Sequence, residues 1–443
     1  MKSDGSAVDV VIVGGGFSGT MLAAQLARRG LSSIIVEGCG RAGRGTAFST
    51  PEDIHLLNVP AAKMSAWPDA PDDFAAAVAD EGYQPGDFVP RRRFGAYLGA
   101  ILDQALSSGR ARLVERNAVA AESLTEGWSV RLDDGTSLSS RALALAQGNQ
   151  PPDPLRAARD LPPGLFVNDP WSDEGREAVR EVATSSGDVL LVGTGLTMVD
   201  VVLSLDAAGH RGQILALSRR GLVPRAHAAF DPVAVDRDEV PHGSVRNLWR
   251  WVRKRSREGS WRAAVDSLRP HSRGLWKALD EEQKQRFLRH ARPWWDVHRH
   301  RIAPEVSGVL KRLVGEGRLE IAAGRIISLR AGNRELIAGI KRRGTGEAGE
   351  RRFSLGLNCT GPLGAIGRSE DGVLKSLMET KLARPDAIGM GLDVDSRSRV
   401  VGAHRAWAVG PLTKGAFWEI VAVPDIRGQA ADVANDIAEE LDR

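Results

Sequence analysis

The sequence is poor in the residues and segments that characterise several classes of protein. Cysteine occurs only twice in 443 residues, at Cys39 and Cys359, with no CxxC pair. This scarcity argues against a disulfide scaffold, a dithiol redox centre and a zinc site. No apolar run reaches the roughly 18 residues that cross a bilayer, and the first eight residues are too short and polar for a signal peptide. We therefore expect a cytoplasmic protein that holds no metal and binds no membrane.

The sequence also lacks a strong excess of charge of one sign. Its net charge is +4, with 42% hydrophobic and 26% charged residues, which is ordinary for a soluble globular protein. We therefore do not expect nucleic acid as a partner. The length favours two or three domains.

Residues 8–37 have the pattern of a dinucleotide-binding unit, which we call the first cradle. The run "VDVVIV" predicts a buried parallel strand, and a helix is expected over about 17–29. Between them, G-x-G-x-x-G places glycines at Gly14, Gly16 and Gly19. They permit a tight turn, the approach of a pyrophosphate to the backbone, and close packing of the helix on the strand. The helix start, with Ser18, points N–H groups at the phosphates.

The second strand of this unit, "SSIIVE", ends in an acidic residue. Glu37 stands 23 positions after Gly14, near the spacing at which a carboxylate binds a ribose hydroxyl. We interpret the first cradle as FAD-binding. The alternative is an ordinary βαβ unit with a glycine-rich turn.

A second cradle is predicted at residues 187–220. The strand "DVLLVG" leads into Gly193 and Gly195, while Met198 stands where the third glycine is expected. The following strand ends in "SRR", which contains Arg219 and Arg220, and arginine binds a 2′-phosphate where an acid would repel it. We interpret this cradle as NADPH-binding, the alternative for the arginines being a solvated basic turn. Two dinucleotides in one chain indicate hydride transfer from nicotinamide to flavin.

The chain resembles the flavoproteins that have two dinucleotide-binding domains. More closely, it resembles the FAD/NAD(P)-binding family that includes flavin-dependent urate hydroxylase-like and amino-acid N-hydroxylase-like members. The matching stretches are "VVIVGGGFSGTMLAAQL", "GRGTAFSTPEDIHLLNVPAAKMSAWPD", "FVPRRRFGAYL", "LLVGTGLTMVD", "LSRRGLVPR", "WWDVHRHRIAPEV", "LNCTGP" and "VGPLTKGAFWEIVAVPDIRGQA". The resemblance implies an FAD enzyme that uses NADPH.

The resemblance also implies roles for residues outside the glycine turns. The segment "HLLNVP" is expected to lie against the isoalloxazine ring, with Asn58 as a polar contact near its reactive edge. His55 is either part of this contact or a capped loop histidine. Arg44 is a candidate to neutralise phosphates, and Val119 is implied to touch the adenine.

Two further segments are expected near FAD. Gly148 lies where a strand returns and the chain crosses to the second domain. Gly410 precedes Pro411 where the larger class has an acid, so backbone amides around Thr413 and Gly415 are expected to replace it. The helix that follows is expected to begin near Gly415 and to direct its positive end at the flavin. Trp418 either covers the flavin ring or packs in the core. Cys359, in "LNCTGP", is expected to be a small buried hydrophobic residue and not a nucleophile.

Residues 226–305 match neither cradle and contain six of the eleven tryptophans. We predict a helical cap over the active site; the alternatives are a polyanion-binding patch on its basic helix and a dimer contact. At the end of the cap, "WWDVHRHRIAPEV" makes His298 and Arg299 catalytic candidates, and Arg299 or Arg301 a candidate for binding a substrate anion. The alternative is capping and packing at a helix end.

These patterns predict an α/β fold with two Rossmann-like domains and a helical cap insertion. The FAD domain is expected at 1–164 and 356–443, the NAD(P)H domain at 165–225 and 306–355, and the cap at 226–305. The predicted function is NADPH-dependent flavin monooxygenation of a small polar, nitrogen-containing substrate with O2. The alternatives are an NAD(P)H-dependent flavin reductase or oxidase with another acceptor, and a flavin-binding sensor that binds a partner. The sequence gives no basis for the oligomeric state.

Overall fold

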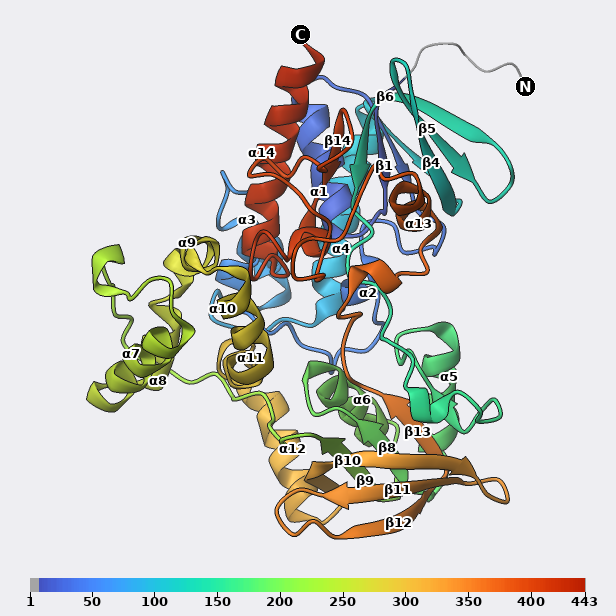
Figure 1. Cartoon of the computed structure of the whole chain (residues 1–443), viewed down its shortest axis with the longest axis vertical. Coiled ribbons are helices and arrows are strands. Elements are labelled where there is room, and N and C mark those ends of the chain that lie inside the picture. Colours follow the sequence, from blue (N-terminus) through green and yellow to red (C-terminus); the bar gives the residue numbers. More distant parts are fainter. Residues whose placement is uncertain (1–7, 443) are drawn as a thin grey trace.

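A computed structural model of the chain describes residues 8–442. It contains two sheets of seven strands each, one in the upper half of Figure 1 and one in the lower half, with a group of helices at their side. The predicted α/β architecture with two Rossmann-like sheets is confirmed. Among residues 8–442, every helix is too short or too polar to cross a membrane.

The first sheet has the strand order β3-β2-β1-β6-β5-β4, and β14 pairs with β6. Its strands are β1 (Val8–Val13), β2 (Ser33–Val36), β3 (Ala111–Val114), β4 (Ala118–Leu124), β5 (Gly127–Leu132), β6 (Ser137–Leu145) and β14 (Ala406–Ala408). β1 lies between β2 and β6 in parallel, with Val13 opposite Val36 and Leu145. This central place explains why the β-branched run of β1 is buried from Val10 to Val13.

The strands between α4 and residue 145 belong to two kinds of pairing within the first sheet. β4, β5 and the start of β6 form an antiparallel meander. β3, in contrast, pairs in parallel with β2 and extends the main sheet. Its short alternating run does not distinguish an edge strand of a parallel sheet from a hairpin strand.

Helices pack on the first sheet from both ends of the chain. α1 packs against both α4 and α14, in the upper half of Figure 1. The helices of this half are α1 (Phe17–Arg28), α2 (Gly45–Phe48), α3 (Asp73–Ala77), α4 (Arg91–Ser107), α13 (Gly372–Glu379) and α14 (Val423–Leu441). One hydrophobic cluster spans these helices and the first sheet, so the two chain ends share a core.

The second sheet repeats the arrangement around a different central strand. Its order is β12-β11-β10-β9-β8-β13-β7. Its strands are β7 (Phe166–Val167), β8 (Val189–Val192), β9 (Ile214–Ser218), β10 (Leu319–Ala331), β11 (Leu336–Arg342), β12 (Ala348–Phe353) and β13 (Leu355–Asn358), with helices α5 (Asp173–Ala183), α6 (Leu196–Ala207) and α12 (Pro304–Gly315). β8 lies between β9 and β13, as β1 lies between β2 and β6. Since β13 pairs with β8, the predicted domain boundary at residue 356 falls inside a strand of this sheet.

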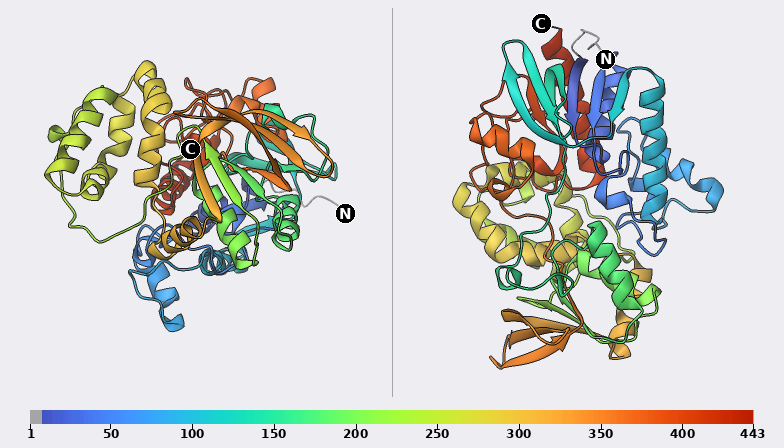
Figure 2. Two further views of the ribbon diagram at one scale, coloured as in Figure 1. Left: turned by 90° about the horizontal axis from the view of Figure 1, so that it is seen from below. Right: turned by 90° about the vertical axis from the view of Figure 1, so that its right-hand side faces the viewer.

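The segment between α6 and α12 is mainly helical and stands beside the two sheets (Figures 1 and 2). Its helices are α7 (Val245–Glu258), α8 (Trp261–Asp266), α9 (Ser272–Ala278), α10 (Glu281–Arg286) and α11 (Arg292–Arg299). A parallel bridge between Ala226 and Ile302 joins the two ends of the segment. Trp276 and Phe287 pack with Trp418, so the cap shares a hydrophobic cluster with the C-terminal part of the chain.

Candidate functional site

The first cradle has the backbone geometry that a glycine turn requires. Gly14 has φ +102°, and a Cβ atom there would lie 2.5 Å from the carbonyl oxygen of Ala146. A Cβ atom at Gly19 would lie 1.9 Å from the carbonyl oxygen of Gly14. Gly16 is the N-cap of α1 and no side chain caps this helix end. Gly14 and Gly19 are therefore required by the close packing of the backbone, whereas Gly16 leaves the N-terminus of α1 open to a phosphate group.

The acid at the end of β2 is held against the glycine turn. The Glu37 carboxylate accepts hydrogen bonds from the backbone N–H groups of Gly15 at 2.9 Å and Cys39 at 3.0 Å. This fixes its position beside the cradle, where a ribose hydroxyl would be bound. Arg44 is exposed next to α2, whereas Arg41 forms an ion pair with Asp173 at 3.3 Å.

The second cradle reproduces this geometry in the second sheet. Gly193 has φ +125°, and a Cβ atom there would lie 2.1 Å from the carbonyl oxygen of Cys359. Gly195 is the N-cap of α6 with φ −88° and ψ −162°, close to the −75° and −163° of Gly16. Met198 is fully buried, so the position of the missing glycine is filled by core packing.

The strand after the second cradle ends differently from β2. The Ser218 hydroxyl hydrogen-bonds to Thr194 at 2.8 Å and accepts from the Gly221 N–H at 3.0 Å, which fixes the turn after β9. Arg219 on this turn is exposed and Arg220 is half-buried. The turn thus presents two cations where the first cradle presents a carboxylate, as a bound 2′-phosphate requires.

His55 makes contacts across the boundary between the two sheets. Its Nδ1 hydrogen-bonds to Thr50 at 2.7 Å, and its Nε2 lies 3.2 Å from the carbonyl oxygen of Asp200 and 3.1 Å from the Ser204 hydroxyl on α6. The ring is buried and packs edge-on to Trp171. Both nitrogens therefore have protein partners, and cofactor contact by His55 stays a prediction.

A buried ion pair that the sequence did not indicate lies next to His55. Arg91, at the start of α4, donates to both carboxylate oxygens of Asp200 on α6, at 2.8 and 2.9 Å. The side chains are 12% and 7% exposed. Because α6 begins at the second cradle and α4 packs against α1 of the first cradle, this pair joins the two halves of the molecule next to both cradles.

A histidine that the sequence did not indicate, His227, contacts the backbone of Asn58. The His227 ring, half-buried against Phe88, places its Nε2 3.0 Å from the carbonyl oxygen of Asn58. Burial lowers the pKa of His227, so the neutral ring donates through Nε2. The backbone N–H of His227 also donates to the carbonyl oxygen of Ile302, where the two ends of the cap segment meet. The segment "HLLNVP" is thus contacted by the part of the cap that joins it to the rest of the chain.

The C-terminal segment closes over the first cradle. Gly410 has φ +76°, and a Cβ atom there would lie 2.3 Å from the Ser18 hydroxyl. Thr413 is buried and donates to the Gly410 carbonyl oxygen at 2.9 Å. A Cβ atom at Gly415 would meet the Asp386 carboxylate at 2.0 Å. The contact of Gly410 with Ser18 places the loop of residues 410–416, the predicted flavin loop, next to the N-terminus of α1 in the first cradle.

Three other predicted cofactor residues have defined positions. Val119 lies on β4 with its backbone against Gly372 at the start of α13. Gly148 follows β6 with φ +70°. Trp418 stacks on Trp276 of the cap, with ring centroids 4.7 Å apart. Trp418 therefore has one face packed in the cap core, and contact of its other face with a flavin stays a prediction.

The candidate catalytic and anion-binding residues at the end of the cap form hydrogen bonds and ion pairs with other residues of the chain. Arg299 donates to the Glu419 carboxylate at 3.2 Å, with side chains 12% and 6% exposed. Arg301 pairs with Asp266. His298 bonds through Nδ1 to the carbonyl oxygen of Trp294 at 2.7 Å. Because carboxylates already neutralise both guanidiniums, anion binding by Arg299 or Arg301 requires the release of an ion pair, and it stays a prediction.

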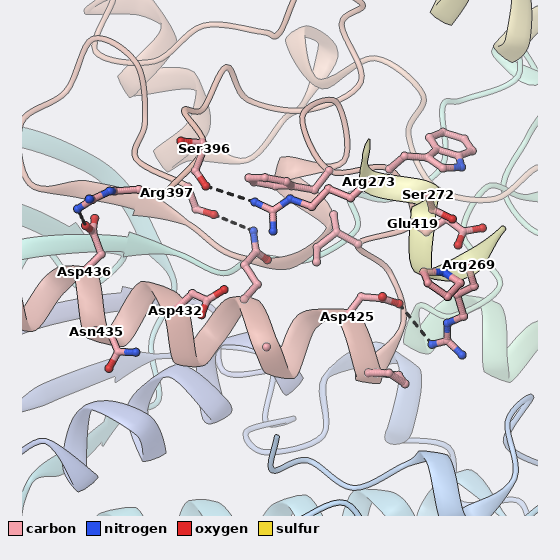
Figure 3. Close-up of a pocket in the computed structure, with 18 of the residues that line it drawn as sticks. Arg269, Ser272, Arg273, Ser396, Arg397, Glu419, Asp425, Asp432, Asn435 and Asp436 are labelled. Carbon is pink, nitrogen blue, oxygen red and sulfur yellow. Dashed lines mark hydrogen bonds and ion pairs between the residues drawn. The ribbon is translucent and has the colours of Figure 1, made fainter. Parts of the chain in front are cut away.

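A cavity of about 790 Å³ lies between the cap and α14 (Figure 3). Its wall includes Arg269 and Arg273 from the cap and Asp425, Gln429 and Asp432 from α14. Burial raises the pKa of Asp425, which lies 3.7 Å from Arg269. The Gln429 side chain donates to Thr413 at 3.0 Å, so one wall of the cavity adjoins the predicted flavin loop.

Comparisons with known proteins agree with this geometry. A family described as FAD-NAD(P)-binding matches residues 11–150. No curated protein matches the sequence. L-lysine 6-monooxygenase from Pseudomonas syringae has a similar structure, with TM-score 0.71 and 16% identity over 98% of this chain and 100% of that one.

Two further structures are similar over nearly the whole chain. The ornithine N-hydroxylase of Kutzneria sp. 744, with reduced FAD, NADP⁺ and L-ornithine, has TM-score 0.65 and 16% identity over 98% of this chain and 99% of that one. The cadaverine monooxygenase of desferrioxamine biosynthesis from Erwinia amylovora, bound to FAD, has TM-score 0.61 and 12% identity over 98% and 94%. The chain therefore carries an FAD-NAD(P)-binding domain at residues 11–150 and has, over almost its whole length, the fold of the two-dinucleotide-domain flavoproteins.

Proposed function

We propose that the protein is an NADPH-dependent flavin monooxygenase that hydroxylates a small amine-bearing substrate. The observation that carries this proposal is the pair of cradles, each with a left-handed glycine and an uncapped helix N-terminus, connected by Arg91 and Asp200. A single dinucleotide would need only one of them. The similar structures are named as an L-lysine 6-monooxygenase, an ornithine N-hydroxylase and a cadaverine monooxygenase, which supports an amine as the substrate.

The residues of the first cradle fit FAD. The N–H groups at the start of α1 and the exposed guanidinium of Arg44 suit a pyrophosphate, and the fixed carboxylate of Glu37 suits a ribose. Bound FAD would supply electron transfer from NADPH and the activation of O2. The chain's own part is to hold the ring beside Asn58 and the Thr413 loop, and to keep water out through the cap.

The turn after β9 is proposed to select NADPH over NADH. We expect the double variant R219A/R220A to raise the KM for NADPH by at least roughly 10- to 150-fold, because the loss of even one charge-assisted hydrogen bond costs about 1.5–3 kcal/mol. The KM for NADH should not change. R211A, an exposed arginine in the loop that precedes β9, is the matched control. Equal effects on both nucleotides would contradict the assignment of the 2′-phosphate to this turn.

The proposed reaction is tested by measuring three quantities in one assay. FAD-loaded protein is mixed with NADPH in air, and NADPH loss, O2 uptake and any product one oxygen atom heavier than the amine are followed. L-lysine, L-ornithine and cadaverine are the first amines to test. A monooxygenase gives the heavier product in proportion to NADPH. Peroxide equal to NADPH, with no such product from any amine tested, would favour an oxidase, and no flavin reduction by NADPH would contradict a second dinucleotide site.

A further inference from the structure

The segment "HLLNVP", residues 55–60, is hydrogen-bonded at its first residue to the helix of the second cradle. The His55 ring is 3% exposed, and its Nε2 lies 3.2 Å from the carbonyl oxygen of Asp200 and 3.1 Å from the Ser204 hydroxyl. Both partners belong to α6, whose N-cap is Gly195 of the second cradle. One side chain therefore joins the segment predicted to lie against the flavin to the helix predicted to bind the nicotinamide nucleotide.

The partners of the His55 ring determine which nitrogen carries the proton. The carbonyl oxygen of Asp200 can only accept a hydrogen bond, so the neutral ring carries its proton on Nε2. Nδ1 is then an acceptor, and the Thr50 hydroxyl at 2.7 Å is its donor. The Ser204 hydroxyl donates to the Glu52 carboxylate at 2.7 Å, which leaves its oxygen free to accept from Nε2. The bond from His55 to α6 thus depends on one tautomer, which Thr50 selects.

Arg91 closes a second connection between the same segment and the same helix. Its backbone N–H donates to the carbonyl oxygen of His55 at 2.8 Å, and its Nε donates to that of Leu56 at 3.1 Å. Its two terminal nitrogens donate to the Asp200 carboxylate. The bonds from His55 to Asp200, from Asp200 to Arg91 and from Arg91 back to His55 therefore form a closed ring. Such a ring restricts movement of the segment relative to α6 in more than one direction.

We propose that His55 is a positioning residue for hydride transfer from NADPH to the flavin. This rests on the proposed function. In that step NADPH loses a hydride and becomes NADP⁺, and the two electrons of the hydride reduce the flavin. Both ring nitrogens of His55 have protein partners and Trp171 packs edge-on against the ring, so His55 acts through the residues that follow it. It fixes Leu57 and Asn58 relative to α6, and so fixes the distance between the two reacting rings.

The first experiment compares two amides at position 55. The amide of asparagine reaches about as far as Nδ1 of histidine, and the amide nitrogen of glutamine about as far as Nε2. H55N can therefore keep the bond to Thr50 and loses the bond to α6, whereas H55Q keeps a donor for α6. Flavin reduction is followed by stopped flow without O2, as FAD-loaded protein is mixed with increasing NADPH. We expect H55N to lower the limiting rate at least tenfold, because a misplacement of about 1 Å can cost about 100-fold, and H55Q to retain most of it.

A positioning role makes further demands on the same measurement. The flavin content, the flavin absorption spectrum and the Kd for NADPH should be unchanged in H55N and H55Q. The slow reduction in H55N should show a primary isotope effect with NADPH deuterated at C4, since hydride transfer itself is slowed. Loss of the isotope effect would place the defect before hydride transfer and overturn the proposal. Equal rates in H55N and H55Q, or a changed flavin spectrum in both, would overturn it as well.

His210 provides a matched control. It is also buried and follows α6, but its Nδ1 bonds to the carbonyl oxygen of Val182 within the second domain. We expect H210Q to lower the melting temperature and to leave the limiting rate of flavin reduction unchanged. If H210Q slows reduction as much as H55N does, the effect belongs to the loss of any buried histidine and the positioning role is wrong.

The second experiment examines the wild-type protein, so it does not depend on the folding of a variant. The histidines are labelled with ¹⁵N, and H55Q identifies the His55 signals by their loss from the NMR spectrum. We expect Nε2 to carry a proton and its signal to show a hydrogen bond to the carbonyl of Asp200. A ring with its proton on Nδ1 alone could not donate to α6 and would overturn the proposal.

Failure of the proposed function and failure of this inference remain distinguishable. Reduction of the wild-type flavin by NADPH tests the two dinucleotide sites without reference to His55. A wild-type protein that is not reduced contradicts the proposed function and this inference together. A wild-type protein that is reduced, with an equally fast H55N variant, contradicts the positioning role alone.

Discussion

Replacement of Gly16 by alanine is expected to give a folded protein that binds FAD roughly 5- to 150-fold more weakly. Gly16 has φ −75°, which alanine adopts, and a Cβ atom there would come no closer than 3.5 Å to Gly45. The fold therefore tolerates the methyl group. It would project into the space that a pyrophosphate needs, and overpacking of this kind opposes binding by about 1–3 kcal/mol. The measurement is the flavin content of the purified protein and a titration with added FAD.

Two other glycines make this result specific. G195A occupies the equivalent position in the second cradle, where no atom lies within 4 Å of the added Cβ. It should retain FAD and raise the KM for NADPH. G19A, in contrast, places a Cβ atom 1.9 Å from the Gly14 carbonyl oxygen and should reduce the stability of the whole protein. Normal flavin content in G16A, or flavin loss in G195A, would contradict the assignment of FAD to the first cradle.

The cradles were predictable because their signal is local. A buried strand, a glycine turn and a helix start occupy about twenty consecutive residues. The left-handed φ of Gly14 and the close approach of Gly19 to the Gly14 carbonyl oxygen are both requirements of the backbone within that stretch. The same reasoning applies to Gly193, whose φ of +125° few other residues adopt. Met198 also shows why the second turn needs no third glycine, since its side chain is fully buried in the core.

The missed residues depend on contacts between distant parts of the chain. Arg91 and Asp200 are 109 positions apart, and His227 meets Asn58 across 169 positions. No periodicity or spacing encodes such pairs. Arg299 illustrates the same limit, since its partner Glu419 stands 120 positions away in the sequence. A catalytic or substrate-binding role for Arg299 stays a prediction.

Removal of the Asp200 carboxylate is expected to have the largest effect on stability. In D200N the Arg91 guanidinium, 12% exposed, loses its bidentate partner and remains buried with an uncompensated charge. Breaking a buried pair in this way lowers the free energy of unfolding by about 3–5 kcal/mol. Urea denaturation and the melting temperature of the FAD-loaded protein measure the effect. E350Q, which breaks the exposed pair of Glu350 with Arg330, is the control and should cost about 0–1 kcal/mol.

A double variant separates the charge from the connection that it makes. R91M/D200L removes both charged groups and fills the space with apolar side chains, which for buried pairs is often neutral or stabilising. We expect it to recover most of the stability lost in D200N. Flavin reduction by NADPH should nevertheless remain slower than in the wild type, because the bidentate bond no longer fixes α6, and with it the second cradle, relative to α4. Recovery of stability together with a wild-type reduction rate would show that the ion pair stabilises the fold without orienting the two dinucleotide sites.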